Sequence, residues 1–131
     1  MSKDVSILTE GFFIIGDVVC KGEIEVCGGK ITDGKVSAKK INVQADGLLE
    51  CDVFTENLVM SNGGKIIGNI TAKNMKLLNG SEIAGDVVYS NLSIEDGAMI
   101  AGNFHKIDND KIAEILENVK TEMLDKENID N

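Results

Sequence analysis

The chain has no proline and no tryptophan, a single histidine, and an aromatic content of only 4% over 131 residues. So few aromatic side chains exclude a large aromatic core. The single histidine, His105, excludes the multi-histidine clusters that catalytic zinc sites use. The 14 glycines instead suit short strands joined by tight corners, because glycine adopts positive φ angles at little cost.

Basic residues are also scarce, since 13 Lys or Arg against 22 Asp or Glu give a formal net charge of −9. This charge disfavours binding to nucleic acids and to anionic membrane surfaces. The cysteines, Cys20, Cys27 and Cys51, are odd in number and lack CxxC spacing, which indicates free thiols in a reducing compartment. The apolar stretch 12–15 is too short for a signal sequence or a membrane span, so we expect a cytoplasmic protein.

The strongest pattern is a triplet of glycine, Asp or Asn, and an apolar residue that returns with a period of 17, at 68–70, 85–87 and 102–104. Related triplets stand at 51–53, 34–36 and 16–18. Alignment on this period predicts a solenoid in which each turn covers the previous one. Four apolar columns result: Ile24, Ile41, Leu58, Met75 and Leu92; Val26, Val43, Met60, Leu77 and Ile94; Leu49, Ile66, Ile83 and Ile100, with Thr32 as the odd member; and Val36, Val53, Ile70, Val87 and Phe104.

Within each turn, apolar and polar residues alternate, which is typical of strands with one buried face. Two further columns mark corners, one mainly of glycine and one of asparagine, both types that tolerate left-handed backbone. Together with the repeated triplet, they give three corners per turn. The sequence therefore predicts an all-β parallel β-helix of about six turns with a triangular cross-section over residues 12–106, preceded by an N-terminal tail at 1–11. The two corner columns are Gly29, Asp46, Gly63, Gly80 and Gly97, and Asn57, Asn74 and Asn91.

The region 107–131 changes to helical spacing, which predicts an amphipathic helix over about 109–125 followed by a tail. At 1.5 Å per residue the helix is about 25 Å long, close to the length of six stacked turns, so it can lie antiparallel along one face. Its apolar stripe requires a partner surface, either in the same chain or in another subunit. The candidate helix-docking or lateral residues are Val19, Phe54, Ile67 and Val88 on the β-helix, and Ile112, Leu116 and Val119 on the helix.

The two ends of a β-helix expose unpaired strand edges and core side chains, so they must be capped or used for assembly. Neither end has an obvious cap in the sequence, which favours end-to-end pairing with a like chain over self-capping by the tails. The candidate polymerisation residues are Phe12, Phe13 and Ile14 at one end and Leu92, Ile94, Ile100 and Phe104 at the other.

Over residues 12–104 the chain resembles the bactofilins, bacterial polymer-forming cytoskeletal proteins. The most specific part is the segment 92–102, a strand followed by an acidic-Gly-Ala turn and a glycine, after turns with the Gly-Asp/Asn-Ile/Val triplet. The resemblance implies a right-handed β-helix that polymerises end to end without nucleotide or other cofactor. It further implies scaffolds for cell shape, division or the placing of envelope proteins, located in the cytoplasm or at the inner face of the cell membrane.

Family members often bind membranes through a short apolar and basic N-terminal segment, but here Lys3 is the only basic residue of that segment, so membrane association stays open. Protein partners are expected on the outer faces or the C-terminal helix. No residue pattern indicates a catalytic, cofactor or metal site. Two alternatives to the scaffold are a β-helical adaptor that does not polymerise and a left-handed β-helix enzyme related to acyltransferases. The latter requires turns in multiples of six residues, which 17 is not.

Overall fold

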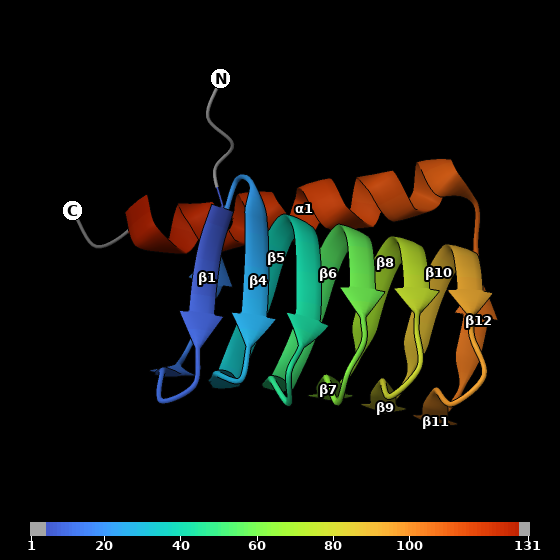
Figure 1. Ribbon diagram of the computed structural model, residues 1–131. Helices are drawn as coiled ribbons and strands as arrows, with labels where there is room; N and C mark the ends of the chain where they lie inside the picture. Colours follow the sequence, from blue (N-terminus) through green and yellow to red (C-terminus); the bar gives the residue numbers. More distant parts are fainter. Residues whose placement is uncertain (1–4, 129–131) are drawn as a thin grey trace.

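The chain winds into a parallel β-solenoid with one C-terminal helix, as the computed structural model of residues 5–128 shows (Figure 1). Twelve strands form one continuous parallel sheet that wraps around the core. As the coil advances from β1 to β12, the strands nearer the viewer run downward and the chain returns upward behind them, so the coil is right-handed (Figure 1). The strands are β1 (Val5–Thr9), β2 (Phe13–Ile15), β3 (Val18–Val19), β4 (Glu23–Cys27), β5 (Lys30–Gln44), β6 (Leu48–Met60), β7 (Lys65–Ile67), β8 (Ile70–Leu77), β9 (Glu82–Ala84), β10 (Val87–Ile94), β11 (Met99–Ala101) and β12 (Phe104–Lys106).

Each turn contributes one strand segment to each of three faces. The first face holds β1, β4 and the C-terminal parts of β5, β6, β8 and β10. The second holds β2, β7, β9, β11 and the N-terminal parts of β5 and β6. The third, here called the helix face, holds β3, the middle of β5 and β6, the N-terminal parts of β8 and β10, and β12.

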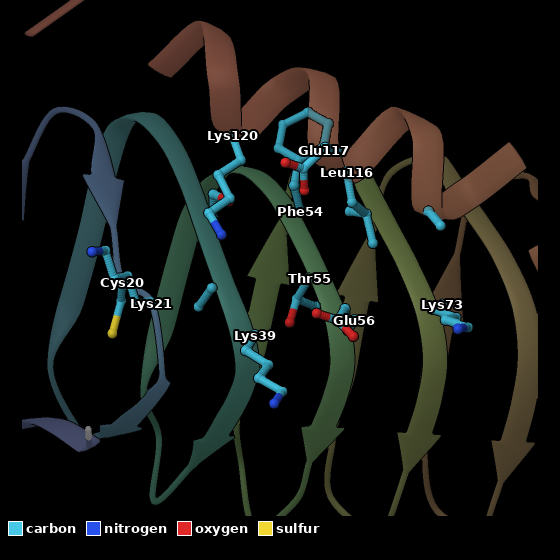
Figure 2. Close-up of a pocket in the computed structure, with 13 residues that line it drawn as sticks. Cys20, Lys21, Lys39, Phe54, Thr55, Glu56, Lys73, Leu116, Glu117 and Lys120 are labelled. Atoms are coloured by element: carbon cyan, nitrogen blue, oxygen red, sulfur yellow. The ribbon is translucent and has the colours of Figure 1, made fainter. Parts of the chain in front are cut away.

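The helix α1 (Asn109–Asn128) packs on the helix face of its own chain. It starts beside the last turn and runs back along the solenoid towards the first, as the sequence predicts (Figures 1 and 2). Its 20 residues span about 30 Å, and its C-terminal end extends past β1 along the side of the first turn (Figure 1). The helix lies along the side of the solenoid and therefore leaves both ends of the described coil uncovered.

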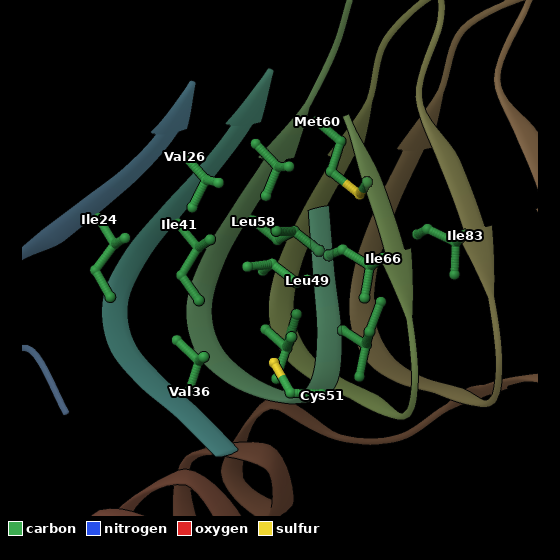
Figure 3. Close-up of a cluster of buried hydrophobic side chains, with 14 of the residues drawn as sticks. Ile24, Val26, Val36, Ile41, Leu49, Cys51, Leu58, Met60, Ile66 and Ile83 are labelled. Carbon is green, nitrogen blue, oxygen red and sulfur yellow. The ribbon is translucent and has the colours of Figure 1, made fainter. Parts of the chain in front are cut away.

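The interior is a dry stack of aliphatic side chains, which the pattern of apolar columns predicts correctly (Figure 3). Side chains in register, such as Ile24 above Ile41 or Ile66 above Ile83, belong to adjacent turns and are almost fully buried. Each fully buried aliphatic side chain stabilises the fold by roughly 1.5–3 kcal/mol relative to exposure. The period of the sequence is thus the path length of one turn of the coil.

One predicted column member is wrong, because the third apolar column contains Ile31 and not Thr32. Ile31 is fully buried and pairs with Leu49, at a spacing of 18, whereas the spacing returns to 17 after a register shift between Thr32 and Lys35. β5 carries one extra residue at that corner, where Asp33 has φ 62°. This residue explains why the spacing is 18 before the corner and 17 after it. For the same reason Gly28, with φ 95°, and not Gly29, occupies the left-handed corner position.

The asparagine column also differs from its predicted role. Residues with positive φ in the described chain do not include Asn57, Asn74 or Asn91. Their side chains instead form a ladder, in which Asn74 Nδ2 donates to Asn57 Oδ1 at 3.0 Å and Asn91 Nδ2 donates to Asn74 Oδ1 at 2.8 Å. The asparagines therefore hold neighbouring turns together through amide hydrogen bonds.

The Asp or Asn of the repeated triplet forms a second ladder along the solenoid. The backbone N–H of Asn69 donates to Asp52 Oδ1 at 3.2 Å, and that of Asp86 donates to Asn69 Oδ1 at 3.4 Å. One turn's side chain thus satisfies the next turn's corner amide. This requirement explains why the triplet accepts Asp and Asn alike, since both supply an oxygen acceptor.

Candidate assembly interface

The four residues predicted at the C-terminal end lie together in the last turn. Leu92, Ile94, Ile100 and Phe104 are each the final member of one inner column, directly after Met75, Leu77, Ile83 and Val87. The side chains one turn earlier are at most 3% exposed, whereas Ile94 is 48% exposed. The exposure arises because no described turn follows, so this end presents an open cross-section of the core.

Phe104 is the largest side chain of this open end and is held in place by the turn before it. Its ring packs against Tyr89 at a centroid distance of 6.0 Å and an interplanar angle of 60°. Such a tilted arrangement is favourable for two aromatic rings. Phe104 is half-buried, so part of its ring faces the space beyond the last turn.

At the N-terminal end the structure separates the three predicted residues. Ile14 lies in an inner column above Ile31. Phe13 points outward, with the Lys30 ammonium 5.2 Å from its ring centroid, a cation–π contact. Phe12 lies at the adjacent corner and is 59% exposed. Only Ile14 therefore belongs to the inner column, while both phenylalanines form an exposed apolar rim.

The predicted N-terminal tail at 1–11 is wrong in part, because β1 already forms the first face of the first turn. Leu8 lies above Val26 and is buried, and Ser6 lies above Ile24 at the open end of the column. The spacing from Leu8 to Val26 is 18, one more than the period of the repeat, so alignment on that period misses it. Of the N-terminal segment considered for membrane binding, Lys3 lies outside the described residues.

Strand edges are open at both ends within residues 5–128. β1, β2 and β3 each pair with a later turn, β4 or β5, and with no earlier strand. β11 and β12 each pair with an earlier strand, β9 or β10, and with no later one. Each end therefore carries both unpaired backbone groups and exposed apolar side chains, the two features that template the addition of further strands.

The candidate helix-docking residues divide between two faces. Val19, Phe54 and Val88 stand in one outward column of the helix face, and Phe54 lies beneath α1 beside Leu116 (Figure 2). Ile67 lies on β7 of the second face, away from the helix, and is 40% exposed (Figure 1). Its assignment to helix docking is wrong. On the helix, Ile112 is completely buried, and Leu116 and Val119 are half-buried.

Side chains suited to metal binding do not converge in the described chain. Among those residues, no three His, Cys, Asp or Glu side chains gather in a way that could hold a metal ion. His105 is exposed on β12, and the cysteines are free thiols, two of them half-buried and Cys51 buried. The part of the chain that the structure covers also contains no helix with the length and hydropathy of a membrane span.

Cys51 occupies a glycine position of the repeat and points into the core, where it is 7% exposed. Burial, assisted by the neighbouring Asp52 carboxylate, raises the pKa of its thiol from 9.0 to about 12. Because the thiolate is the reactive form, the folded chain keeps Cys51 unreactive at neutral and mildly alkaline pH.

We expect two thiols, Cys20 and Cys27, to react with a chromogenic disulfide at pH 8, and the third to react only in denaturant. Stability should also fall as the pH rises above 9.0, because the unfolded chain then releases the Cys51 proton while the folded chain retains it. Thiol counting with and without denaturant measures the first effect, and Cys51→Ala is the control that removes the slow thiol. Equal reactivity of all three thiols in the native chain would contradict this assignment.

The fold and its open ends define a class of protein, a parallel β-solenoid with unpaired strand edges at both ends of the described coil. Comparison with protein families agrees, because a family model described as polymer-forming cytoskeletal, that of the bactofilins, matches residues 6–105. The chain belongs to the bactofilin family. The resemblance read from the sequence is thereby confirmed.

A solved structure supports the same assignment. The chain is similar to the cytoskeletal bactofilin BacA, whose atomic structure was revealed by solid-state NMR. The TM-score is 0.71 at 28% sequence identity, and the match covers 81% of this chain and 99% of that chain. A search of curated proteins found no match. The family match and the right-handed coil contradict the alternative of a left-handed β-helix enzyme.

Proposed function

We propose that this chain assembles end to end, without nucleotide, into cytoplasmic filaments that act as a scaffold for cell shape, division or the placing of envelope proteins. The observation that carries the proposal is the pair of open ends, each with unpaired strand edges and exposed inner-column side chains. Stacking a second protomer on such an end continues the backbone ladder and buries the exposed apolar surface. Both changes are favourable.

The position of α1 supports the proposal over the non-polymerising adaptor. An adaptor of this fold needs an element that blocks at least one end, and α1 lies along the side of the solenoid. Both ends therefore stay accessible in the described chain while the helix is docked. Further proteins, the cargo of the scaffold, would bind the outer faces or the helix.

The local structure of the glycine corners supports independence of nucleotide. Phosphate-binding loops place their glycines before a helix N-terminus, where backbone N–H groups converge on the anion. Here the glycine corners at Gly63, Gly68, Gly80 and Gly85 precede strands. The energy of assembly would therefore come from the end contact itself.

Sedimentation of the purified chain, freed of nucleotide with apyrase, tests the proposal. We expect the protein to pellet at high speed and to form filaments in negative-stain microscopy, equally with and without added ATP or GTP. Discrete particles that stay in the supernatant under both conditions would favour the adaptor. Pelleting that requires a nucleotide would contradict the mechanism while leaving the scaffold role intact.

A further inference from the structure

The helix covers only one side of the helix face and leaves a groove beside it. A cavity of about 330 Å³ lies between α1 and the neighbouring strands (Figure 2). Phe54 and Leu116 form its apolar wall beneath the helix, and small side chains such as Ser37 and Ala38 form its floor. Viewed from outside, the face thus consists of a ridge, the helix, and a parallel groove.

The groove carries a row of lysines along the solenoid. Lys39 and Lys73 occupy the same outward position two turns apart, with Glu56 as the member between them, and Lys21 lies in the corner between β3 and β4 of the first turn; all four residues line the cavity. Lys120 of the helix joins them (Figure 2). Within residues 5–125 none of these four lysines forms an ion pair. In a chain of net charge −9, a row of unpaired cations is a distinct surface.

The ridge carries the opposite charge. Asp110, Glu114, Glu117 and Asp125 are all exposed. At 100° per residue they fall within a stripe about 80° wide, roughly opposite the buried side of the helix at Ile112. An acidic ridge therefore runs beside a groove in which four lysines outnumber two carboxylates, those of Glu56 and Glu117.

We propose that this face binds the same face of a second copy of the chain, so that neighbouring filaments pair laterally. A surface with one row of each sign is not complementary to an anionic membrane or to a uniformly acidic protein, since one row is always repelled. It is complementary to itself under a two-fold rotation. The two-fold axis must run parallel to the solenoid axis, because that rotation places the ridge of each copy in the groove of the other copy. A two-fold axis perpendicular to the solenoid would place ridge against ridge.

A two-fold axis parallel to the solenoid leaves each residue at its own level, meaning its position along the solenoid. The levels of the charged residues agree with this axis. Leu116 lies beside Phe54 (Figure 2), and Lys73 belongs to the next turn, about 4.8 Å or three helical residues nearer the start of α1, so the partner's Glu114 would lie level with Lys73. Lys21 lies three turns earlier, about 14 Å at the spacing of parallel strands, or nearly ten helical residues. It is therefore level with the helix between Glu122 and Asp125. Both lysines would meet carboxylates.

The experiment uses charge reversal in a chain that also carries Phe104→Arg, so that lateral pairing is measured apart from the end contact. If the wild-type chain does not pellet, the same variants are made without Phe104→Arg. Sedimentation equilibrium should show a dimer with a dissociation constant below roughly 0.1 mM. Reversing the row (Lys21→Glu with Lys73→Glu) or the ridge (Glu114→Lys with Asp125→Lys) should each weaken dimerisation at least about tenfold.

Combining all four substitutions should restore the dimer, because the two facing pairs, Lys73 with the partner's Glu114 and Lys21 with the partner's Asp125, are then exchanged and the net charge of the parent is regained. The matched control is Lys40→Glu with Lys76→Glu, which makes the same charge change on the first face and should leave the dimer intact. Circular dichroism checks the fold of each variant.

A monomeric parent, a four-fold variant that stays monomeric, or a control as weak as the row variant would each overturn the proposal. So would flotation of the parent with phosphatidylserine vesicles that the row reversal abolishes.

Discussion

Replacing Phe104 with Arg is expected to abolish pelleting of the chain while leaving its β-rich circular dichroism unchanged. In the isolated protomer the introduced guanidinium can reach water, because Phe104 is half-buried at the open end. In a filament the next protomer covers this position and buries the charge without a partner. Such burial costs at least about 3 kcal/mol, which weakens the end contact by more than about a hundredfold.

The matched control for this experiment is His105→Arg. His105 lies next to Phe104 on the same strand, β12, but is exposed and stands in the outward column. This substitution adds a similar charge at the same end without placing it over the core, so pelleting should persist. If Phe104→Arg filaments still sediment, the C-terminal end is not the contact. If both variants lose pelleting, net charge and not the core cross-section controls assembly.

Replacing Gly85 with Ala is expected to destabilise the solenoid by about 3 kcal/mol and to lower its melting temperature by roughly 10 °C. Gly85 has φ 147° and stacks directly on Gly68 of the previous turn. A Cβ at Gly85 would overlap the carbonyl oxygen of Gly68, a backbone atom that cannot move without disturbing the ladder. Thermal unfolding followed by circular dichroism measures the shift.

Gly16→Ala separates the two causes of the lost stability, which are the unusual backbone angle and the overlap with the stacked carbonyl oxygen. Gly16 stands at the equivalent position of the first turn, with φ 119°, but a Cβ there would meet nothing within 4 Å. It therefore suffers only the cost of the unusual backbone angle, about 1 kcal/mol. A melting temperature of Gly85→Ala no lower than that of Gly16→Ala would show that the stacked carbonyl is not the constraint on the repeat. Both variants are measured in the Phe104→Arg chain, because without end-to-end contacts no second protomer covers Gly16 in the first turn.

Much of the candidate interface could be predicted because it follows from the same columns as the core. Once Ile83 and Ile100 are assigned to one column, the last member must lie at an open end. The N-terminal end was harder to predict, since its strand β1 carries Val5 and Ile7 on the outward side and Ser6 in an inner column. The alternation there reads as a mixed tail, and only pairing with β4 shows which residues face the core.

The lysine row illustrates what a linear reading misses. Lys21, Lys39 and Lys73 are far apart in the sequence, so they do not resemble a basic segment. The coil brings them to one side of the solenoid, and the packing of α1 beside them forms a groove. The helix itself was predictable from the spacing of its apolar residues. Its position along and around the solenoid, however, depends on contacts with strands from five different parts of the chain.

The order of residues is enough to establish that this protein is a parallel β-solenoid, because a chemical period equal to one turn has no other economical explanation. It is also enough to assign the side chains that stack in the interior, since burial demands apolar residues at every level of a column. Contacts in three dimensions were needed to show where the first turn begins, where extra residues shift the register, and which outward face the helix covers. These features depend on backbone pairing and on non-local packing, which have no period in the sequence for a pattern to reveal.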